Sequence, residues 1–262
     1  MSSFERISSK DNDVIKIASK LISSAKFRRE KQQFVLDGLR LCKDAALNGF
    51  PIDCLIVGDS AYSKLTADAE FLSKSAERSC IVPDHIISKI SDTVNPQGFI
   101  CICKMKKIDR FDINSDGLYI ALENVADPSN LGAIARSAEA FNFNGILVSD
   151  RGCDPYSPKA LRASMGALLR IPTVVVNDLL AFIKNTDLDT YASVVDKTAQ
   201  SIRDVNFKKG SIAFIGNEAN GLSKEVVNDC KYKTTIPMTG KAESLNAATA
   251  AAIIMWEMSC QK

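Results

Sequence analysis

The sequence predicts an α/β protein of two domains. Short apolar segments alternate with stretches in which apolar residues recur at helical spacing along the 262-residue chain. The polar segment K-I-D-R-F-D-I-N-S interrupts this alternation and predicts a linker over residues 107–115. A chain of this length is expected to form two domains, here residues 1–106 and 116–262.

The first domain is predicted to be a small α/β sandwich. Its first helix follows from Val14, Ile17 and Leu21, which share one helical face. Asn48 and Gly49 are typical of the end of the second helix. Helices are expected at residues 13–24, 39–47, 60–75 and 84–90, and strands at residues 34–36, 54–57, 80–82 and 98–104.

The second domain repeats the alternation with more strongly apolar strands. Strands are expected at residues 118–122, 145–148, 173–176, 191–195, 211–215 and 234–236, and helices at residues 130–141, 158–168, 224–228 and 245–258. Continuous apolar strands separated by helices are typical of a mostly parallel sheet that is covered on both faces.

Composition excludes several classes of protein. The chain is 46% apolar and 24% charged, and no apolar run is long enough to cross a bilayer. The amino-terminal residues M-S-S-F-E-R-I-S-S-K-D lack the apolar segment of a signal peptide. The eight cysteines form no C-x-x-C pair and there is one histidine, His85. We therefore expect reduced thiols, a cytoplasmic location, no metal and no membrane.

The front of the chain is its most basic part. Residues 1–31 carry eight Lys or Arg and four Asp or Glu. This cluster is either a solvated helix face or a patch that binds RNA phosphates. The candidate RNA contacts are Lys16, Arg28, Arg29, Lys31 and Arg40.

Three segments of the second domain share one design, in which a strand runs into a Gly- or Pro-containing loop and then into a helix. They are residues 123–138, 215–223 and 236–250. Such loops lie outside the carboxyl ends of parallel strands and offer backbone groups to a ligand. The first strand is not followed by G-x-G-x-x-G and no P-loop is present, which disfavours nicotinamide, flavin and ATP.

Polar side chains accompany these loops. Asn130 is placed to cap a helix, and Arg136 follows it near the loop end of that helix, where a surface ion pair is the alternative. Glu218 lies between Gly216 and Gly221, where it could hold a hydroxyl or an arginine, or be a solvated turn residue.

The third loop has its own candidates. Pro237 ends the strand, and Ser244 is expected to cap the last helix. Ser244 and Asn246 could orient a substrate or Arg136, with helix capping as the alternative role.

Taken in order, the three segments resemble the three motifs of the SpoU/TrmH family of RNA ribose 2′-O-methyltransferases, within the SPOUT superfamily. The matching stretches are N-L-G-A-I-A-R, G-N-E-A-N-G, and I-P-M followed by S-L-N. S-P-K-A-L-R-A-S-M-G-A is also similar to the family, and N-D-V-I-K, F-V-L-D-G-L-R and N-P-Q-G are similar to its N-terminal substrate-binding domain. Asp37 stands where Glu is usual, and Ala247-Ala248 replace the commoner Val-Ser.

The resemblance implies S-adenosylmethionine as cofactor, a deep trefoil knot in the second domain, a homodimer, and a first domain like the RNA-binding folds of ribosomal proteins. The residues that it implies for cofactor binding are Gly216, Gly221, Ile236, Met238 and Leu245. The residues that it implies for catalysis and RNA contact are Asn130, Arg136, Glu218, Ser244 and Asn246.

The implied reaction is in-line attack of a ribose 2′-hydroxyl on the cofactor's methyl group. Arg136 is expected to stabilise the developing oxyanion and to position it, because a guanidinium does not readily give up a proton. The proton would leave to phosphate, to water or to Glu218. The expected substrate is 23S ribosomal RNA. The alternatives are tRNA, a methylated base instead of a ribose, and a catalytically silent RNA-binding protein.

Overall fold

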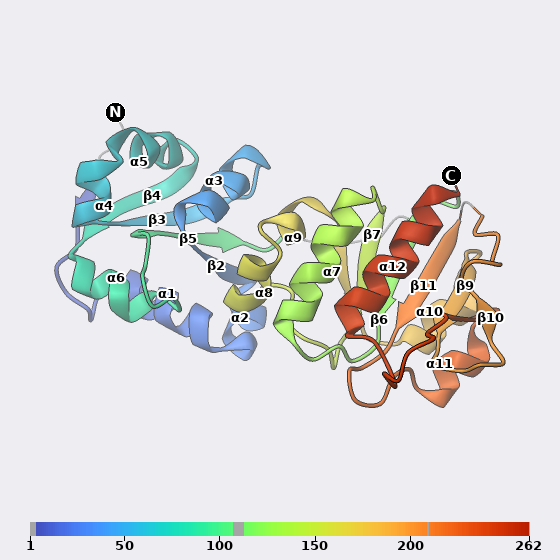
Figure 1. The fold of residues 1–262 in the computed structure, drawn as a ribbon. Coiled ribbons are helices and arrows are strands. Elements are labelled where there is room, and N and C mark those ends of the chain that lie inside the picture. Colours follow the sequence, from blue (N-terminus) through green and yellow to red (C-terminus); the bar gives the residue numbers. More distant parts are fainter. Residues whose placement is uncertain (1–3, 107–112, 209, 262) are drawn as a thin grey trace. The chain divides into compact units, whose positions relative to one another are not determined.

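The structure, a computed structural model, describes residues 4–106, 113–208 and 210–261 (Figure 1). It divides into an N-terminal unit, Met1–Lys107 with Tyr156–Arg162, and a C-terminal unit, Ile108–Pro155 with Ala163–Lys262. Most of the expected linker, residues 107–112, lies outside the described residues. Each unit has its own sheet and helices, which confirms the α/β class.

The N-terminal unit is built on a five-stranded mixed sheet in the order β1-β4-β3-β5-β2. Strand β5 is antiparallel to both of its neighbours, whereas β4 is parallel to β1 and β3. The strands are β1 (Glu5–Arg6), β2 (Gln33–Asp37), β3 (Ile52–Gly58), β4 (Ala76–Val82) and β5 (Phe99–Lys104). The short edge strand β1 was not predicted, because two residues carry no periodicity.

Six helices cover this sheet within the described residues. They are α1 (Asp13–Ser23), α2 (Ala25–Lys31), α3 (Leu39–Leu47), α4 (Asp59–Lys64), α5 (Thr66–Ser73) and α6 (Asp84–Ile90). Helices α1 and α6 share a core on one face, and α3 and α5 pack on the other. Ser24 ends α1 and caps α2, so an unpredicted second helix follows it directly. The single helix expected at 60–75 is two helices that meet at Leu65.

The C-terminal unit contains a seven-stranded sheet in the order β10-β12-β9-β11-β6-β7-β8, in which every neighbouring pair is parallel. The strands are β6 (Leu118–Leu122), β7 (Gly145–Ser149), β8 (Thr173–Val176), β9 (Asp189–Ser193), β10 (Gln200–Ser201), β11 (Ser211–Ile215) and β12 (Tyr232–Thr235). The predicted parallel sheet is confirmed. Ile215 pairs with Leu122, so β6 and β11 end at the same level of the sheet.

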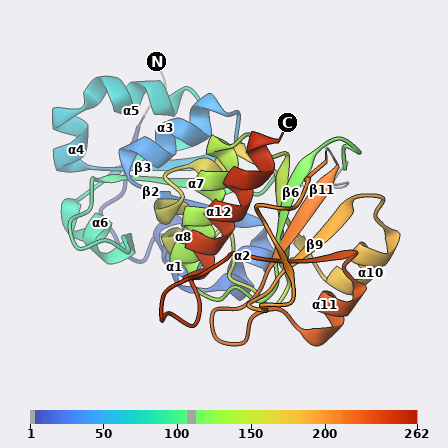
Figure 2. The same ribbon diagram turned by 45° about the vertical axis from the view of Figure 1, so that its right-hand side comes forward.

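Helices cover both faces of this sheet (Figure 2). Helices α7 and α12 pack together on one face, while α10 and α11 enclose a core on the other. The helices are α7 (Pro128–Ala140), α9 (Ala167–Arg170), α10 (Leu179–Asn185), α11 (Lys224–Asp229) and α12 (Ala247–Cys260). Helix α8 (Pro158–Ala163) precedes α9 in the sequence, but all of it except Ala163 belongs to the N-terminal unit. Helix α10 was not predicted, and the helix expected at 158–168 is broken where Met165 and Gly166 adopt left-handed backbone. The knot is not visible in these views and stays a prediction.

Gly132 in α7 lies where another segment of the chain passes very close to the helix. A Cβ atom at this position would lie 2.4 Å from the Cβ of Ala163. The chain at Ala163 and Ser164 therefore crosses α7 at a distance that only glycine allows.

Candidate active site

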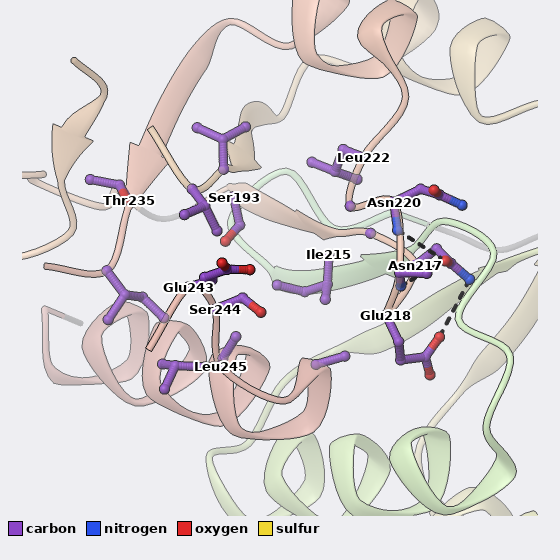
Figure 3. Close-up of a pocket in the computed structure, with 18 of the residues that line it drawn as sticks. Ser193, Ile215, Asn217, Glu218, Asn220, Leu222, Thr235, Glu243, Ser244 and Leu245 are labelled. Atoms are coloured by element: carbon purple, nitrogen blue, oxygen red, sulfur yellow. Dashed lines mark hydrogen bonds between the residues drawn. The ribbon is translucent and has the colours of Figure 1, made fainter. Parts of the chain in front are cut away.

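A pocket of about 470 Å³ lies at the carboxyl ends of β9, β11 and β12 (Figure 3). This is where a parallel sheet is expected to bind ligands. All five residues implied for cofactor binding line the pocket, together with Glu218 and Ser244. Its full lining is Ser193, Val194, Val195, Ile215, Gly216, Asn217, Glu218, Ala219, Asn220, Gly221, Leu222, Thr235, Ile236, Met238, Glu243, Ser244, Leu245, Ala247 and Ala250.

The loop after β11 folds back on itself through two glycines. Asn217 and Gly221 exchange both backbone hydrogen bonds, at 3.0 and 2.9 Å. Gly221 adopts a φ of +68°, and a Cβ atom at Gly216 would lie 2.0 Å from the carbonyl carbon of Gly221. Position 216 therefore requires glycine because a side chain would clash with Gly221. Position 221 favours glycine because its backbone is left-handed.

Glu218 ties this loop to the loop that follows β6. Its carboxylate accepts hydrogen bonds from the backbone N–H groups of Ala126 and Asp127, both at 3.2 Å, and from Nδ2 of Asn130 at 2.8 Å. Partial burial raises the pKa of Glu218, but the hydrogen bonds from Asn130 and the backbone outweigh it, so the pKa lies below its ordinary value. Glu218 is therefore held as a carboxylate that turns toward α7 (Figure 3).

Asn130 and Asn246 extend this connection to the third segment. Nδ2 of Asn246 donates to Oδ1 of Asn130 at 3.0 Å. Oδ1 of Asn246 accepts from the N–H groups of Ala248 and Thr249 at the start of α12. Glu218, Asn130 and Asn246 thus form one hydrogen-bonded chain that fixes the orientation of both amides.

Two expected helix caps were assigned to the wrong residues. Asp127, not Asn130, caps α7 by accepting from the N–H of Ser129, and Pro128 occupies the first turn. Asn246 caps α12, which is the alternative role considered for it, whereas Ser244, the expected cap, does not. An aspartate directly before proline satisfies the free N–H groups of a helix start, which leaves Asn130 in the first turn with its side chain free to cross-link the loops.

The remaining catalytic candidates are not part of this hydrogen-bonded chain. Arg136 is exposed, lies six residues after Asn130 on α7, and has no hydrogen-bond or ion-pair partner among the described residues. That separation corresponds to about 9 Å along the helix axis. Ser244 is an exposed residue of the pocket wall.

Four of the five basic candidates in the N-terminal unit are exposed, namely Lys16, Arg29, Lys31 and Arg40. Arg28 is only 4% exposed, and its Nη1 donates to the carbonyl oxygens of Leu21 and Ile22 at 2.6 and 3.1 Å. These carbonyls lie at the end of α1, where no further helical N–H groups reach them. The prediction that Arg28 contacts RNA is therefore wrong, and Arg28 joins α1 to α2.

Sequence reasoning missed the pocket wall formed by the end of β9. Ser193, Val194 and Val195 line the pocket, and Val195 is 68% exposed. Only the order of the strands reveals this wall. Strand β9 lies directly beside β11, so the residues after β9 lie beside the loop that follows β11. That order is not encoded in the local pattern of either strand.

Neither a membrane-spanning helix nor a metal site is found in the described residues. In the segments that the structure describes, no helix is long and apolar enough to cross a membrane. Over the same segments, no group of three or more His, Cys, Asp or Glu side chains could hold a metal ion. All eight cysteines are free thiols, and only Cys260 is exposed.

Comparison with solved structures covers nearly the whole chain. An rRNA methyltransferase from Sinorhizobium meliloti has a TM-score of 0.85 and 27% identity, covering 97% of both chains. Its AdoMet-bound structure has a TM-score of 0.83 and 28% identity, again over 97% of both chains. These structures share both units of the fold.

Sequence comparison gives the same result. An uncharacterized tRNA/rRNA methyltransferase from Synechocystis is 29% identical over 98% of this chain and 94% of the relative. A 23S rRNA (uridine(2479)-2′-O)-methyltransferase from Streptomyces viridochromogenes is 27% identical over 92% of this chain and 88% of the relative. An MRM3-like substrate binding domain matches residues 12–101, and the SpoU rRNA Methylase family matches residues 117–256. The chain therefore belongs to the SpoU rRNA methylase family and is a methyltransferase.

Proposed function

We propose that this protein transfers the methyl group of S-adenosylmethionine to a ribose 2′-hydroxyl of ribosomal RNA, with 23S rRNA as the favoured substrate. The observation that carries the proposal is the chain Glu218–Asn130–Asn246, which joins all three loop segments beside the pocket. The Streptomyces viridochromogenes relative, whose name specifies 23S rRNA ribose methylation, supports the choice of substrate.

The pocket suits S-adenosylmethionine, whose sulfonium supplies an activated methyl group. Two charged side chains line it, and both are acidic. Glu218 turns toward α7, while Glu243 turns toward Ser193 (Figure 3). An acidic and otherwise neutral lining favours a cationic ligand over a phosphate-bearing one. The backbone of Gly216, Gly221 and Leu245 would hold the cofactor, with Ile236 and Met238 against its apolar parts.

Arg136 supplies the positive charge that would stabilise the attacking ribose oxygen. The attacking ribose hydroxyl develops negative charge. The exposed guanidinium of Arg136, which has no partner within the described ranges of the chain, is available to stabilise it. Asn130, Ser244 and Asn246 would orient the ribose next to it. Glu218 is a poor choice of base, because its carboxylate already accepts several N–H groups and its lowered pKa disfavours protonation. We therefore assign the proton to water or to a substrate phosphate.

The two domains would have different roles in the reaction, one in RNA binding and one in methyl transfer. We propose that residues 1–106 bind the RNA, through Lys16, Arg29, Lys31 and Arg40, and that residues 116–262 carry out methylation. The match of residues 12–101 to a substrate binding domain supports this division. A cytoplasmic location, where ribosomal RNA is found, is consistent with eight free thiols.

A homodimer is part of the proposal. Helices α7 and α12 pack together, and Trp256 on α12 is 56% exposed while its ring contacts Phe141. An exposed tryptophan on a paired-helix face is typical of a subunit interface. Sedimentation of the wild type and of Trp256→Glu tests this: the proposal expects a dimer that the substitution dissociates, and a monomeric wild type contradicts it.

Methylation assays test the reaction and the substrate together. Purified protein is mixed with labelled cofactor and with ribosomal RNA or tRNA, and the methylated product is digested to nucleosides. A 2′-O-methylnucleoside from ribosomal RNA is expected. Label in tRNA, label in a base, or RNA binding without transfer would each replace the proposal with the corresponding alternative. Arg136→Lys should lower the single-turnover rate if planar guanidinium geometry matters.

A further inference from the structure

Glu123 is a buried carboxylate to which the proposed reaction assigns no part. It follows the last residue of β6 and is 8% exposed. Its Oε2 accepts the backbone N–H of Ser223 and its Oε1 accepts the Ser223 hydroxyl, both at 2.7 Å. A carboxylate that receives two such donors in one buried place forms a strong, well-oriented link.

Ser223 lies at the point where the loop after β11 leaves the pocket. Its hydroxyl oxygen also accepts from the N–H of Val226 and caps α11. The preceding residues Gly221 and Leu222 line the pocket. At the other end of the loop, the N–H of Glu123 donates to the carbonyl of Ile215 at 2.8 Å. Glu123 therefore holds both ends of the pocket loop.

We propose that Glu123 is a positioning residue for the cofactor: through Ser223 it holds the loop 216–222 in its binding shape before the cofactor arrives. This inference rests on the proposed cofactor site. A loop that is ordered in advance costs the ligand less to bind, so Glu123 acts on cofactor affinity. Glu218 has a different role: it orients Asn130, which is proposed to contact the substrate, and so it acts on the rate of methyl transfer.

The test measures S-adenosylmethionine and S-adenosylhomocysteine binding by calorimetry without RNA. Glu123→Ala removes the acceptors of both the Ser223 N–H and the Ser223 hydroxyl. Because the hydroxyl can turn to another acceptor and the N–H cannot, the variant is expected to raise Kd about tenfold, which corresponds to one strong buried hydrogen bond. Glu123→Gln keeps one acceptor for the N–H and one donor for the hydroxyl, so it should bind within about threefold of wild type. At saturating cofactor the bound ligand itself orders the loop, Glu218 included, so Glu123→Ala should change the single-turnover rate by less than it changes Kd.

Ser223→Ala is the second variant, which carries the test if Glu123→Ala does not fold. It should also raise Kd, and Glu123→Ala/Ser223→Ala should have a Kd no higher than that of Glu123→Ala, because the two side chains act on the pocket loop through one link. The loss of the α11 cap is measured separately, as a lower melting temperature. A merely structural role predicts another outcome, in which the bound stoichiometry falls with unfolding while Kd of the folded fraction is unchanged. That outcome, or a lower rate with unchanged Kd, overturns the inference.

The same measurements separate this inference from the proposed function. If the wild type binds cofactor but methylates no RNA, the proposed function fails and the role of Glu123 in affinity can still be measured. If the wild type methylates RNA and Glu123→Ala binds cofactor as tightly as wild type, the role of Glu123 fails and the function stands.

Discussion

Replacing Glu218 by Gln should slow methyl transfer at saturating cofactor, beyond any weakening of cofactor binding that follows from the loss of one acidic side chain of the pocket. The carboxylate receives N–H groups at both oxygens, from Ala126 at Oε2 and from Asp127 and Asn130 at Oε1. An amide keeps one acceptor oxygen and presents a donor on the other side. Whichever way the amide turns, at least one N–H loses its partner and meets another donor.

The size of the expected rate decrease follows from the number of N–H groups that lose their acceptor. A hydrogen bond to a charged group contributes about 1.5–3 kcal/mol, and a donor left without a partner costs a similar amount when buried. Glu218 is exposed, so water recovers part of the loss and about 1–2 kcal/mol remains. If this energy holds Asn130 and Asn246 in their reactive orientation, the rate should fall about 5- to 30-fold.

The assay is a single-turnover methyl transfer at saturating cofactor, with calorimetric Kd for the cofactor measured in parallel. The matched control is Glu225→Gln, an exposed carboxylate of α11 outside the pocket lining, which should leave both quantities unchanged. A wild-type rate for Glu218→Gln would refute the reasoning, and so would an increase in Kd that accounts for the whole effect.

Three further outcomes are expected. Gly216→Ala should abolish cofactor binding seen by calorimetry, because its Cβ would lie 2.0 Å from Gly221, and binding at wild-type Kd would contradict the loop geometry. Because the pKa of Glu218 is lowered, its hydrogen bond from Asn130 is fully formed above the ordinary carboxyl pKa and is lost as pH falls through the lowered value. Titration of Glu218 should therefore lower the rate of methyl transfer on the acid side of the pH–rate profile and have no effect on the alkaline side. Arg28→Met should lower the melting temperature without changing the salt dependence of RNA affinity, whereas Arg29→Met should reduce that salt dependence and leave melting unchanged; the reverse pattern would restore Arg28 as an RNA contact.

Local patterns predicted the fold class and most of the elements. The buried strands β6, β7 and β11 are continuous apolar runs, and their type follows from sequence alone. The elements that were missed are short or lack periodicity, such as β1 and β10. The broken helix at Met165 was missed because a left-handed methionine is set by its surroundings and not by its own preference.

The candidate site was predicted unevenly for a related reason. Gly216, Gly221 and the third-segment residues were implied by the family resemblance, and they lie around one pocket because each follows a strand of the same sheet. The partners of Asn130 could not be predicted, since Glu218 is 88 positions and Asn246 is 116 positions away along the chain. The order of strands brings these positions together, and that order is a property of the whole domain.

The hydrogen bond between Asn130 and Asn246 also sets when, during synthesis of the chain, the candidate site can be completed. The 116 positions that separate them are translated in roughly 6–23 s at ordinary rates of protein synthesis. During that interval the N-terminal unit can already fold, while Asn130 still lacks the partner that orients it. A growing chain of this protein would thus fold its proposed RNA-binding domain first and complete its proposed active site only when α12 docks.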